Sequence, residues 1–404
     1  MLVAIMLDAF NHRYLEFEAP FISSIMARAH VTRVIPAFGF EPDAAHIAGL
    51  WPELSDGGMH FWWGPEGSVF RWTTPWGRFA ARLPTGAQRV VRRGIQATNL
   101  AVARPLGRKY GGNPVGIPLE RLHLFDVSQS RVMFQPGFSA SPTIFDLLSQ
   151  QQRPWKYFGS PVHRSKADRL ARRIEKADLR NVDFVFVSMA DLDKVGHVYG
   201  TRGVEIQDAW RRVDSAVERI YRHCLQDGKP VELVIYGDHG MVDVTSHIDL
   251  RPALRRLRSR EWVDYAYFLD STFARFWTFT DEAKAEIMEM LDGVPGGSLV
   301  TTADRERYRC AYSHNRFGDI IFWADEGHIL LPNFYQKLNP VRGMHGYRRE
   351  VIDNHTGLIA YAEARETGHR LPEPVEMVDI FATLVDMLAL PWPDAADGRS
   401  VLQP

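Results

Sequence analysis

Three largely apolar segments, each followed at once by side chains that can bind cations or move protons, constrain the fold of this chain most. These segments and the residues after them are 2–7 with Asp8, 184–187 with Asp191 and Asp193, and 231–236 with Asp238 and His239. Short, continuous apolar runs are typical of buried strands in parallel sheets. Because sites in open α/β sheets form beyond the carboxyl ends of strands, the pattern predicts one site at that edge.

Helical patterns separate the strand-like segments. They cover residues 165–176, 204–225 and 374–388. In the longest of them, apolar residues recur every three or four positions, which is the period of a helix with one buried face. The alternation of strands and helices predicts an α/β fold, with a doubly wound, mostly parallel sheet flanked by helices.

Two long stretches interrupt this rhythm and are interpreted as cap insertions. The first, 55–130, is aromatic at its start and then strongly basic, with no acidic residue from 78 to 109; the second is 245–340. The catalytic core is then expected in 1–54, 131–244 and 341–404. A chain of 404 residues is long enough for one large domain with such insertions.

Bulk properties exclude several classes of protein. A net charge of −1 gives no general affinity for polyanions, and two cysteines, Cys224 and Cys310, are too few for a disulfide scaffold. The apolar start lacks a basic region before it, and no apolar run reaches the ~20 residues that span a bilayer. We therefore expect a cytoplasmic protein. No nucleic-acid-binding motif is present, so no nucleic-acid partner is expected.

Four short motifs carry the candidate chemistry. In chain order they are Leu7-Asp8-Ala9-Phe10, Asp193-x-x-Gly-His197-x-x-Gly200, Gly237-Asp238-His239-Gly240-Met241 and Gly343-Met344-His345-Gly346-Tyr347. Carboxylates and neutral imidazoles are the ligands of zinc and similar divalent cations. Two such ions about 4 Å apart can hold both the attacking and the leaving oxygen of a displacement at phosphorus.

The order of these motifs resembles the alkaline-phosphatase superfamily, and most closely its type I phosphodiesterase/nucleotide-pyrophosphatase branch. Further similar segments are Gly49-Leu50-Trp51-Pro52-Glu53, residues 142–148 and residues 316–320. The resemblance extends from Asp8 to about Leu402 and is weakest in 55–130. It implies an alkaline-phosphatase-like fold and a two-metal hydrolase of phosphoric esters or anhydrides, acting on a small nucleotide- or lipid-linked diester.

The resemblance also implies two groups of metal ligands. Asp193, His197 and His345 would hold the first ion, and Asp8, Asp238 and His239 would hold the second. Zinc is the usual metal of this branch, with manganese as the alternative. Asp191 is a spare carboxylate, interpreted as a hydrogen-bonded loop residue.

The family's nucleophile is missing. Its Thr or Ser lies on a turn before a helix, and the family register places Gly39 there; residues 36–49 contain no Ser, Thr or Cys. Three alternatives follow. Hydroxide generated on the metals attacks directly, with Gly39 leaving space for it; Glu41 or Asp43 acts as ligand, general base or carboxylate nucleophile; or the protein binds a phosphorylated ligand without turnover. Glu41 is our candidate catalytic residue. His46 is interpreted as a histidine of the core or one that supports a site residue from behind.

Two further interpretations concern rival activities and partners. A metal-dependent phosphotransferase or mutase is a rival on the same metal platform, whereas a sulfatase is disfavoured because its modified Cys or Ser is absent. The expected partner is a small phosphorylated substrate. The basic segment 78–109 is interleaved with apolar residues, and three interpretations of it stay open: it binds a polyphosphate, it makes a peripheral contact with an anionic membrane, or it is a solvated charged face that packs on the core. Pro84 and Gly86 are expected to interrupt any single long helix there. The sequence indicates no oligomeric state.

Overall fold

The computed structural model describes residues 1–103, 116–129, 131–160, 166–336, 339–363 and 370–403. Its largest element is a seven-stranded sheet in the order β17-β2-β16-β7-β1-β6-β5. The strands are β1 (Leu2–Leu7), β2 (His30–Ile35), β5 (Trp155–Phe158), β6 (Phe184–Met189), β7 (Glu232–Tyr236), β16 (Thr356–Tyr361) and β17 (Val375–Glu376). Within this sheet only β16 runs antiparallel to its neighbours, so the predicted mostly parallel sheet is confirmed.

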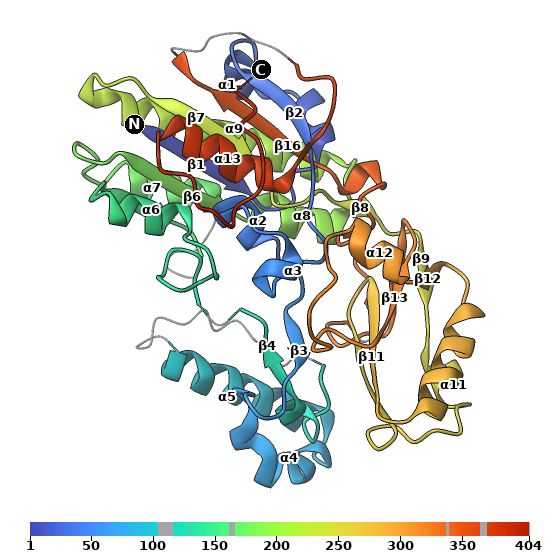
Figure 1. Cartoon of the computed structure of the whole chain (residues 1–404). Coiled ribbons are helices and arrows are strands. Elements are labelled where there is room, and N and C mark those ends of the chain that lie inside the picture. Colours follow the sequence, from blue (N-terminus) through green and yellow to red (C-terminus); the bar gives the residue numbers. More distant parts are fainter. Residues whose placement is uncertain (104–115, 130, 161–165, 337–338, 364–369, 404) are drawn as a thin grey trace.

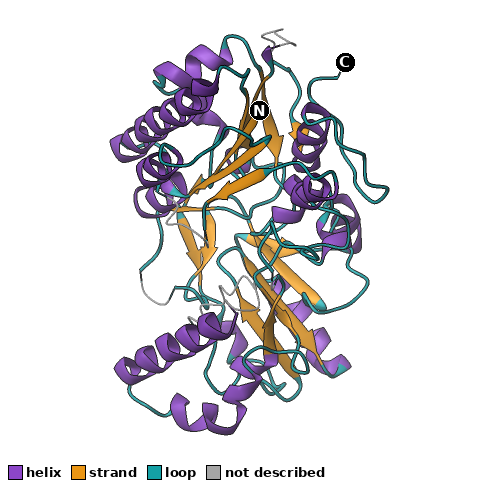
Figure 2. Ribbon diagram, turned by 90° about the vertical axis from the view of Figure 1, so that its left-hand side faces the viewer, coloured by secondary structure: helices purple, strands orange, loops and turns teal. Residues whose placement is uncertain are grey.

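Helices cover both faces of this sheet (Figure 2), because alternate residues of β1 pack in opposite directions. Val3, Ile5 and Leu7 pack on the side of α1 (Pro20–Met26), α7 (Ala167–Ile174) and α9 (Val204–Cys224). The intervening residues pack on the side of α2 (Asp43–Ala48), α6 (Ile144–Gln150) and α13 (Met377–Met387). The doubly wound α/β fold is therefore as predicted, and α7, α9 and α13 lie within the three predicted helical ranges.

A second, four-stranded antiparallel sheet lies beside the central one, in the order β10-β11-β13-β12. Its strands are β10 (Tyr265–Leu269), β11 (Phe273–Thr278), β12 (Gly297–Leu299) and β13 (Ile320–Ala324), and α11 (Asp281–Asp292) packs on it. Two short two-stranded sheets are formed by the segments before and after this region. In one, β9 (Ser246–Ile248) pairs with β14 (His328–Leu330), and in the other β8 (Val242–Asp243) pairs with β15 (Gly343–Met344).

A small module of two strands and two helices forms one end of the molecule (Figure 1). It contains the antiparallel pair β3 (Phe61–Trp63) and β4 (Phe125–Val127), with α4 (Thr74–Ala81) and α5 (Thr85–Ala103) between them in the chain. Residues 82–84 separate the two helices, as Pro84 predicts, whereas the interruption expected at Gly86 is wrong because Gly86 lies within α5. Phe61 and Phe125 of the module pack with Phe268 and Trp277 of the second sheet.

The boundaries predicted for the core and the two insertions remain predictions, although β3 to β4 and β9 to β14 fall inside the two insertion ranges. In the described part of the chain, no helix is both long and apolar enough to cross a membrane. The segment 104–109 of the basic stretch lies outside the described residues.

Candidate active site

The register of the central sheet brings three of the predicted ligands to one edge. Leu7 of β1 pairs with Met189 of β6, and Met6 pairs with Tyr236 of β7, so the three strands end side by side. The chain therefore delivers Asp8, Asp193 and Asp238 just beyond the same edge, which is where sites form in parallel sheets.

The turn after β1 is held in a strained conformation that fixes the carboxylate of Asp238 and the backbone of Asp8. Ala9 has a φ of 61°, in the left-handed region that residues with a side chain seldom occupy. Its backbone N–H donates to Asp238 Oδ1 at 3.1 Å, and the N–H of His239 donates to the same oxygen at 3.0 Å. The N–H of Asp8 donates to the Met189 carbonyl at 2.8 Å. Such strain persists where surrounding bonds enforce it, as at functional sites.

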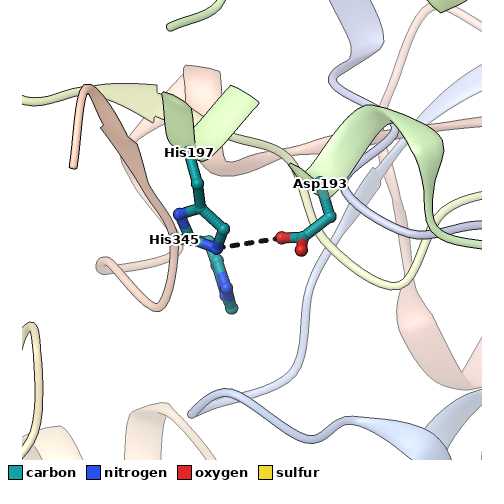
Figure 3. A group of neighbouring side chains, drawn as sticks. All are labelled: Asp193, His197 and His345. Carbon is teal, nitrogen blue, oxygen red and sulfur yellow. Dashed lines mark ion pairs between the residues drawn. The ribbon is translucent and has the colours of Figure 1, made fainter. Parts of the chain in front are cut away.

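Asp193, His197 and His345 form the first group (Figure 3), with ligand atoms within 4.8 Å of one another. Asp193 and His197 lie one turn apart on α8 (Asp191–Tyr199), and Asp193 Oδ1 is 3.0 Å from His197 Nε2. His197 Nδ1 lies 2.8 Å from the Gly343 carbonyl, and donation to that oxygen leaves Nε2 as the ligand nitrogen.

Asp8, Asp238 and His239 form the second group, again within 4.8 Å. His239 Nε2 lies 3.7 Å from Asp8 Oδ1 and 3.6 Å from Asp238 Oδ2. His239 Nδ1 lies 2.8 Å from the Gly240 carbonyl, the same backbone arrangement that fixes the ring of His197. In both groups a backbone carbonyl thus orients a histidine toward carboxylates.

The two groups adjoin each other through a pair of imidazoles. The rings of His239 and His345 stack with centroids 3.6 Å apart and planes inclined by 6°. Burial, followed by the neighbouring His239 and His197, lowers the pKa of His345 well below its usual range. The buried Nδ1 of His345 has no hydrogen-bond partner among the described residues. His345 is therefore a neutral imidazole with unused ligand capacity.

The pKa values of two carboxylates in the site are also shifted. Burial, then the negative charges of Asp193, Asp238 and Asp43, raise the pKa of Asp8 well above its ordinary value. Burial also raises the pKa of Asp193, but the hydrogen bond and charge of His197 outweigh it and the net pKa is lowered. Several buried carboxylates facing one another are stabilised by a cation, and this donor set fits divalent ions such as zinc.

All six residues line one cavity of about 350 Å³. Glu41, Asp43 and His60 line the same cavity. A second cavity of about 350 Å³ shares Phe40, His60, His197 and His345 with it. The remaining residues around this second cavity are Ser271, Tyr335, Gln336, Val341 and Met344. The cavity of the predicted ligands therefore adjoins a second, mainly apolar chamber.

Glu41 lies just before α2, which begins at Asp43, and its backbone pairs with Gly58. Its Oε1 is 2.9 Å from His60 Nδ1, and its side chain is largely buried. His60 was not predicted as a site residue. It comes from the start of the first insertion range, where one histidine beside aromatic residues carries no recognisable spacing.

Gly39 has no room for a side chain. Its φ is +99°, and a Cβ built there would lie 1.9 Å from the Gly58 carbonyl oxygen. The prediction that Gly39 leaves space for an attacking hydroxide is therefore wrong, because the Gly58 backbone fills that space. The cavity beside Glu41 and Asp43 provides the room instead.

Asp191 is hydrogen-bonded as predicted, since its Oδ2 accepts a 2.7 Å hydrogen bond from the N–H of Ala167 at the start of α7. The prediction that it lies in a loop is wrong, because Asp191 is the first residue of α8. His46 is a fully buried core histidine, with Nδ1 2.9 Å from the Tyr236 hydroxyl.

Solved structures with a similar fold cover nearly the whole chain. Human ectonucleotide pyrophosphatase/phosphodiesterase 5 superposes with a TM-score of 0.68 at 16% identity, covering 99% of this chain and 96% of that one. The murine protein, as an inactive threonine-to-alanine variant in complex with AMP, gives a TM-score of 0.67 at 16% identity, covering 97% and 95%. These likenesses establish an alkaline-phosphatase-like fold.

Relatives found by sequence match part of the chain. Alkaline phosphatase PhoD of Zymomonas mobilis is 26% identical over 262 residues, which is 54% of this chain and 44% of that protein. Ectonucleotide pyrophosphatase/phosphodiesterase family member 7 of Rattus norvegicus is 24% identical over 252 residues, which is 55% of this chain and 51% of that protein. The chain thus spans about half the length of these relatives. The sequence pattern of the type I phosphodiesterase / nucleotide pyrophosphatase family matches residues 2–348, and the chain belongs to this family.

Proposed function

We propose that this protein is a hydrolase of phosphoric diesters or anhydrides that works with two divalent cations, zinc or alternatively manganese. The observation that carries the proposal is the stacking of His239 on His345, which joins two three-residue groups of metal-ligand type into one site. Asp193, His197 and His345 would hold one ion, and Asp8, Asp238 and His239 the other. The cations would supply charge stabilisation for the phosphoryl oxygens.

Glu41 is proposed to accept the proton of the attacking water. The water oxygen forms the new P–O bond, the bond to the leaving group breaks, and the leaving group departs with the electron pair. Glu41 lines the cavity of the six ligands, and His60 at 2.9 Å from Oε1 is placed to orient the carboxylate. Asp43, at the first position of α2 and in the same cavity, is the alternative acceptor.

This route differs from that of the family's hydroxyl nucleophile. Among the relatives, the murine structure is of a protein made inactive by replacing a threonine. In this chain, residues 36–49 contain no Thr, Ser or Cys, and the backbone at Gly39 excludes a side chain. The same fact favours one rival function, a protein that binds phosphorylated ligands without turning them over.

The mainly apolar chamber supports a substrate with an apolar or aromatic group next to its phosphate. Phe40 and Tyr335 line it, and Ser271 and Gln336 add polar groups. Gln336 Oε1 is buried with no partner among the described residues, so it is available to a ligand. A nucleotide- or lipid-linked diester matches these features. A cytoplasmic location stays a prediction.

The proposal is tested by measuring bound metal and hydrolysis of a chromogenic phosphodiester, beside the matching monoester, with zinc or manganese supplied. We expect two ions per chain and turnover of the diester. Two ions with binding of a nucleoside monophosphate, but no turnover of any ester, would replace the hydrolase by the binding protein. Failure to bind any divalent ion would refute both functions.

A further inference from the structure

The outward sides of α4 and α5 carry highly exposed apolar side chains. Among the described residues, the two large hydrophobic side chains with the highest exposed fractions are Phe79 of α4 at 71% and Val90 of α5 at 68%. Trp72 and Val102, at 43% and 61%, belong to the same module. Clusters of exposed apolar residues mark surfaces that meet another apolar phase.

The same face is strongly basic. Between residues 71 and 103 the chain has six arginines and no Asp, Glu or Lys. Five of these arginines are exposed and form no ion pair within the described parts of the chain: Arg71, Arg78, Arg82, Arg89 and Arg93. The sixth, Arg92, is buried and interacts with Glu120. The exposed charge is therefore left for a partner outside the chain.

Helical periodicity puts these two properties on one side of each helix. Gly77 and Ala80 are the buried positions of α4, so Phe79 points outward between Arg78 and Arg82. In α5, Ile95 is buried while Val90 lies exposed, between the exposed Arg89 and the exposed Arg93 one turn further. Both helices lie at the end of the molecule away from the central sheet (Figure 1).

We propose that this face, made by α4 and α5, docks on the surface of an anionic lipid bilayer. Arginines pair with lipid phosphates and carboxylates, while Phe79 and Val90 enter the acyl boundary. A nucleic acid would satisfy the arginines and could stack on Phe79 or Trp72, but it offers nothing to the exposed aliphatic side chains of Val90 and Val102. An anionic lipid surface binds both the exposed arginines and the exposed apolar side chains, so it is the partner that fits this face.

The module that would dock is joined directly to the active-site cavity by the chain. The module is attached through β3, whose first residue, Phe61, follows His60 of the cavity. The buried guanidinium of Arg275 fixes this strand, donating from Nη1 to the Phe61 carbonyl at 2.7 Å while Asp270 Oδ2 accepts from Nε at 2.7 Å. The inference stands independently of the proposed hydrolase, because none of the docking residues lines the cavity.

Co-sedimentation with vesicles tests the proposal. We expect the full chain to bind phosphatidylcholine vesicles that contain one third phosphatidylglycerol, to release them at high salt, and to leave pure phosphatidylcholine vesicles unbound. Replacing Arg89 and Arg93 together by Gln should weaken binding about thirtyfold, since each arginine contributes by its charge near the surface. Val90→Ser and Phe79→Ser should also weaken it, without lowering the thermal unfolding midpoint.

Matched controls lie elsewhere on the surface. One control variant is Val204→Ser, at a valine that is 61% exposed at the start of α9. The other replaces the exposed Arg255 and Arg256 together by Gln. Both controls should bind anionic vesicles like the unchanged protein. The proposal is overturned by absent vesicle binding, by equal losses in the controls, or by arginine-dependent binding to a DNA duplex with none to vesicles.

Discussion

The imidazoles of His239 and His345 lie face to face at 3.6 Å, although the two residues belong to different ligand groups and are 106 positions apart in sequence. Two protonated rings at that distance would repel each other, and burial with the neighbouring histidines already lowers the pKa of His345. The stack therefore favours a neutral His345 ring, which is the form that binds metal ions.

Replacing His345 by Ala is expected to remove metal and activity together. The change deletes a ligand-type side chain of one group and also the ring that covers His239 in the other. Because even residues that only orient a metal ligand change affinity by about 10–100-fold, loss of the ligand itself should lower turnover by more than about 100-fold. Metal content by mass spectrometry and diester turnover measure both effects.

The exposed His247 supplies the control, since it lies outside the cavity. His247→Ala should keep both metal content and turnover. Normal metal content with normal turnover in His345→Ala would show that the ligand assignment is wrong.

Asp8→Asn is expected to stabilise the protein without metal while weakening metal binding. Burial and three neighbouring carboxylates raise the folded-state pKa of Asp8 above its ordinary value of 3.8. The folded state therefore holds a proton at Asp8 more tightly than the unfolded state does, and the stability that this proton contributes is lost as the pH rises from 3.8 through the folded-state pKa. At neutral pH, removing the charge should raise the unfolding midpoint by a few degrees.

With zinc added, the unchanged protein should be more stable than Asp8→Asn, because only the unchanged protein then gains the full binding free energy of both ions. Thermal unfolding with chelator and with zinc, between pH 5 and pH 8, measures the difference. Asp394, an exposed residue outside the cavity, is the control for loss of one carboxylate charge. An Asp8→Asn protein less stable than the unchanged one in chelator would contradict the repulsion inferred among these carboxylates.

The parts of this architecture that the sequence predicted are those encoded locally. Continuous apolar runs identified β1, β6 and β7, and parallel pairing then fixed Asp8, Asp193 and Asp238 at one edge. Strands β2 and β16 were not predicted. In β2, polar residues such as Thr32 and Arg33 interrupt the apolar pattern, and both strands are assembled by pairing across the sheet.

The residues around the six candidate ligands could not be predicted from the sequence. His60, Ser271 and Tyr335 reach the cavities from the two insertion ranges, positioned by packing between segments about 200 residues apart. No local spacing encodes such an approach. The missing hydroxyl was visible in the sequence, whereas the contact of Gly39 with the Gly58 carbonyl depends on the fold.

Gly39→Ala is expected to destabilise the protein, so a nucleophile cannot be restored at this position by simple substitution. The new Cβ would meet the Gly58 carbonyl, and alanine would have to adopt a φ of +99°. Backbone strain of this kind costs about 1–3 kcal/mol, and the clash adds to it. Denaturant unfolding of the metal-free protein measures the loss.

Gly94 in α5 is the matched control, because a Cβ there meets nothing within 4 Å. Gly94→Ala should gain about 0.5–1 kcal/mol of stability, as alanine favours a helix over glycine. Equal effects of the two substitutions, in either direction, would mean that the Gly58 backbone does not occupy the space beside residue 39.

Glu41→Gln separates the proposed base from the alternatives. The amide keeps the shape of the side chain but cannot take a proton, so turnover should fall by about 10²–10⁴-fold, the usual contribution of a general base. Metal content should be unchanged, because Glu41 belongs to neither ligand group. His60→Ala should reduce turnover less than Glu41→Gln, since His60 only orients the carboxylate at 2.9 Å. Asp43→Asn is the companion variant: if it abolishes turnover while Glu41→Gln leaves turnover intact, the proton acceptor is Asp43 and the role assigned to Glu41 is wrong.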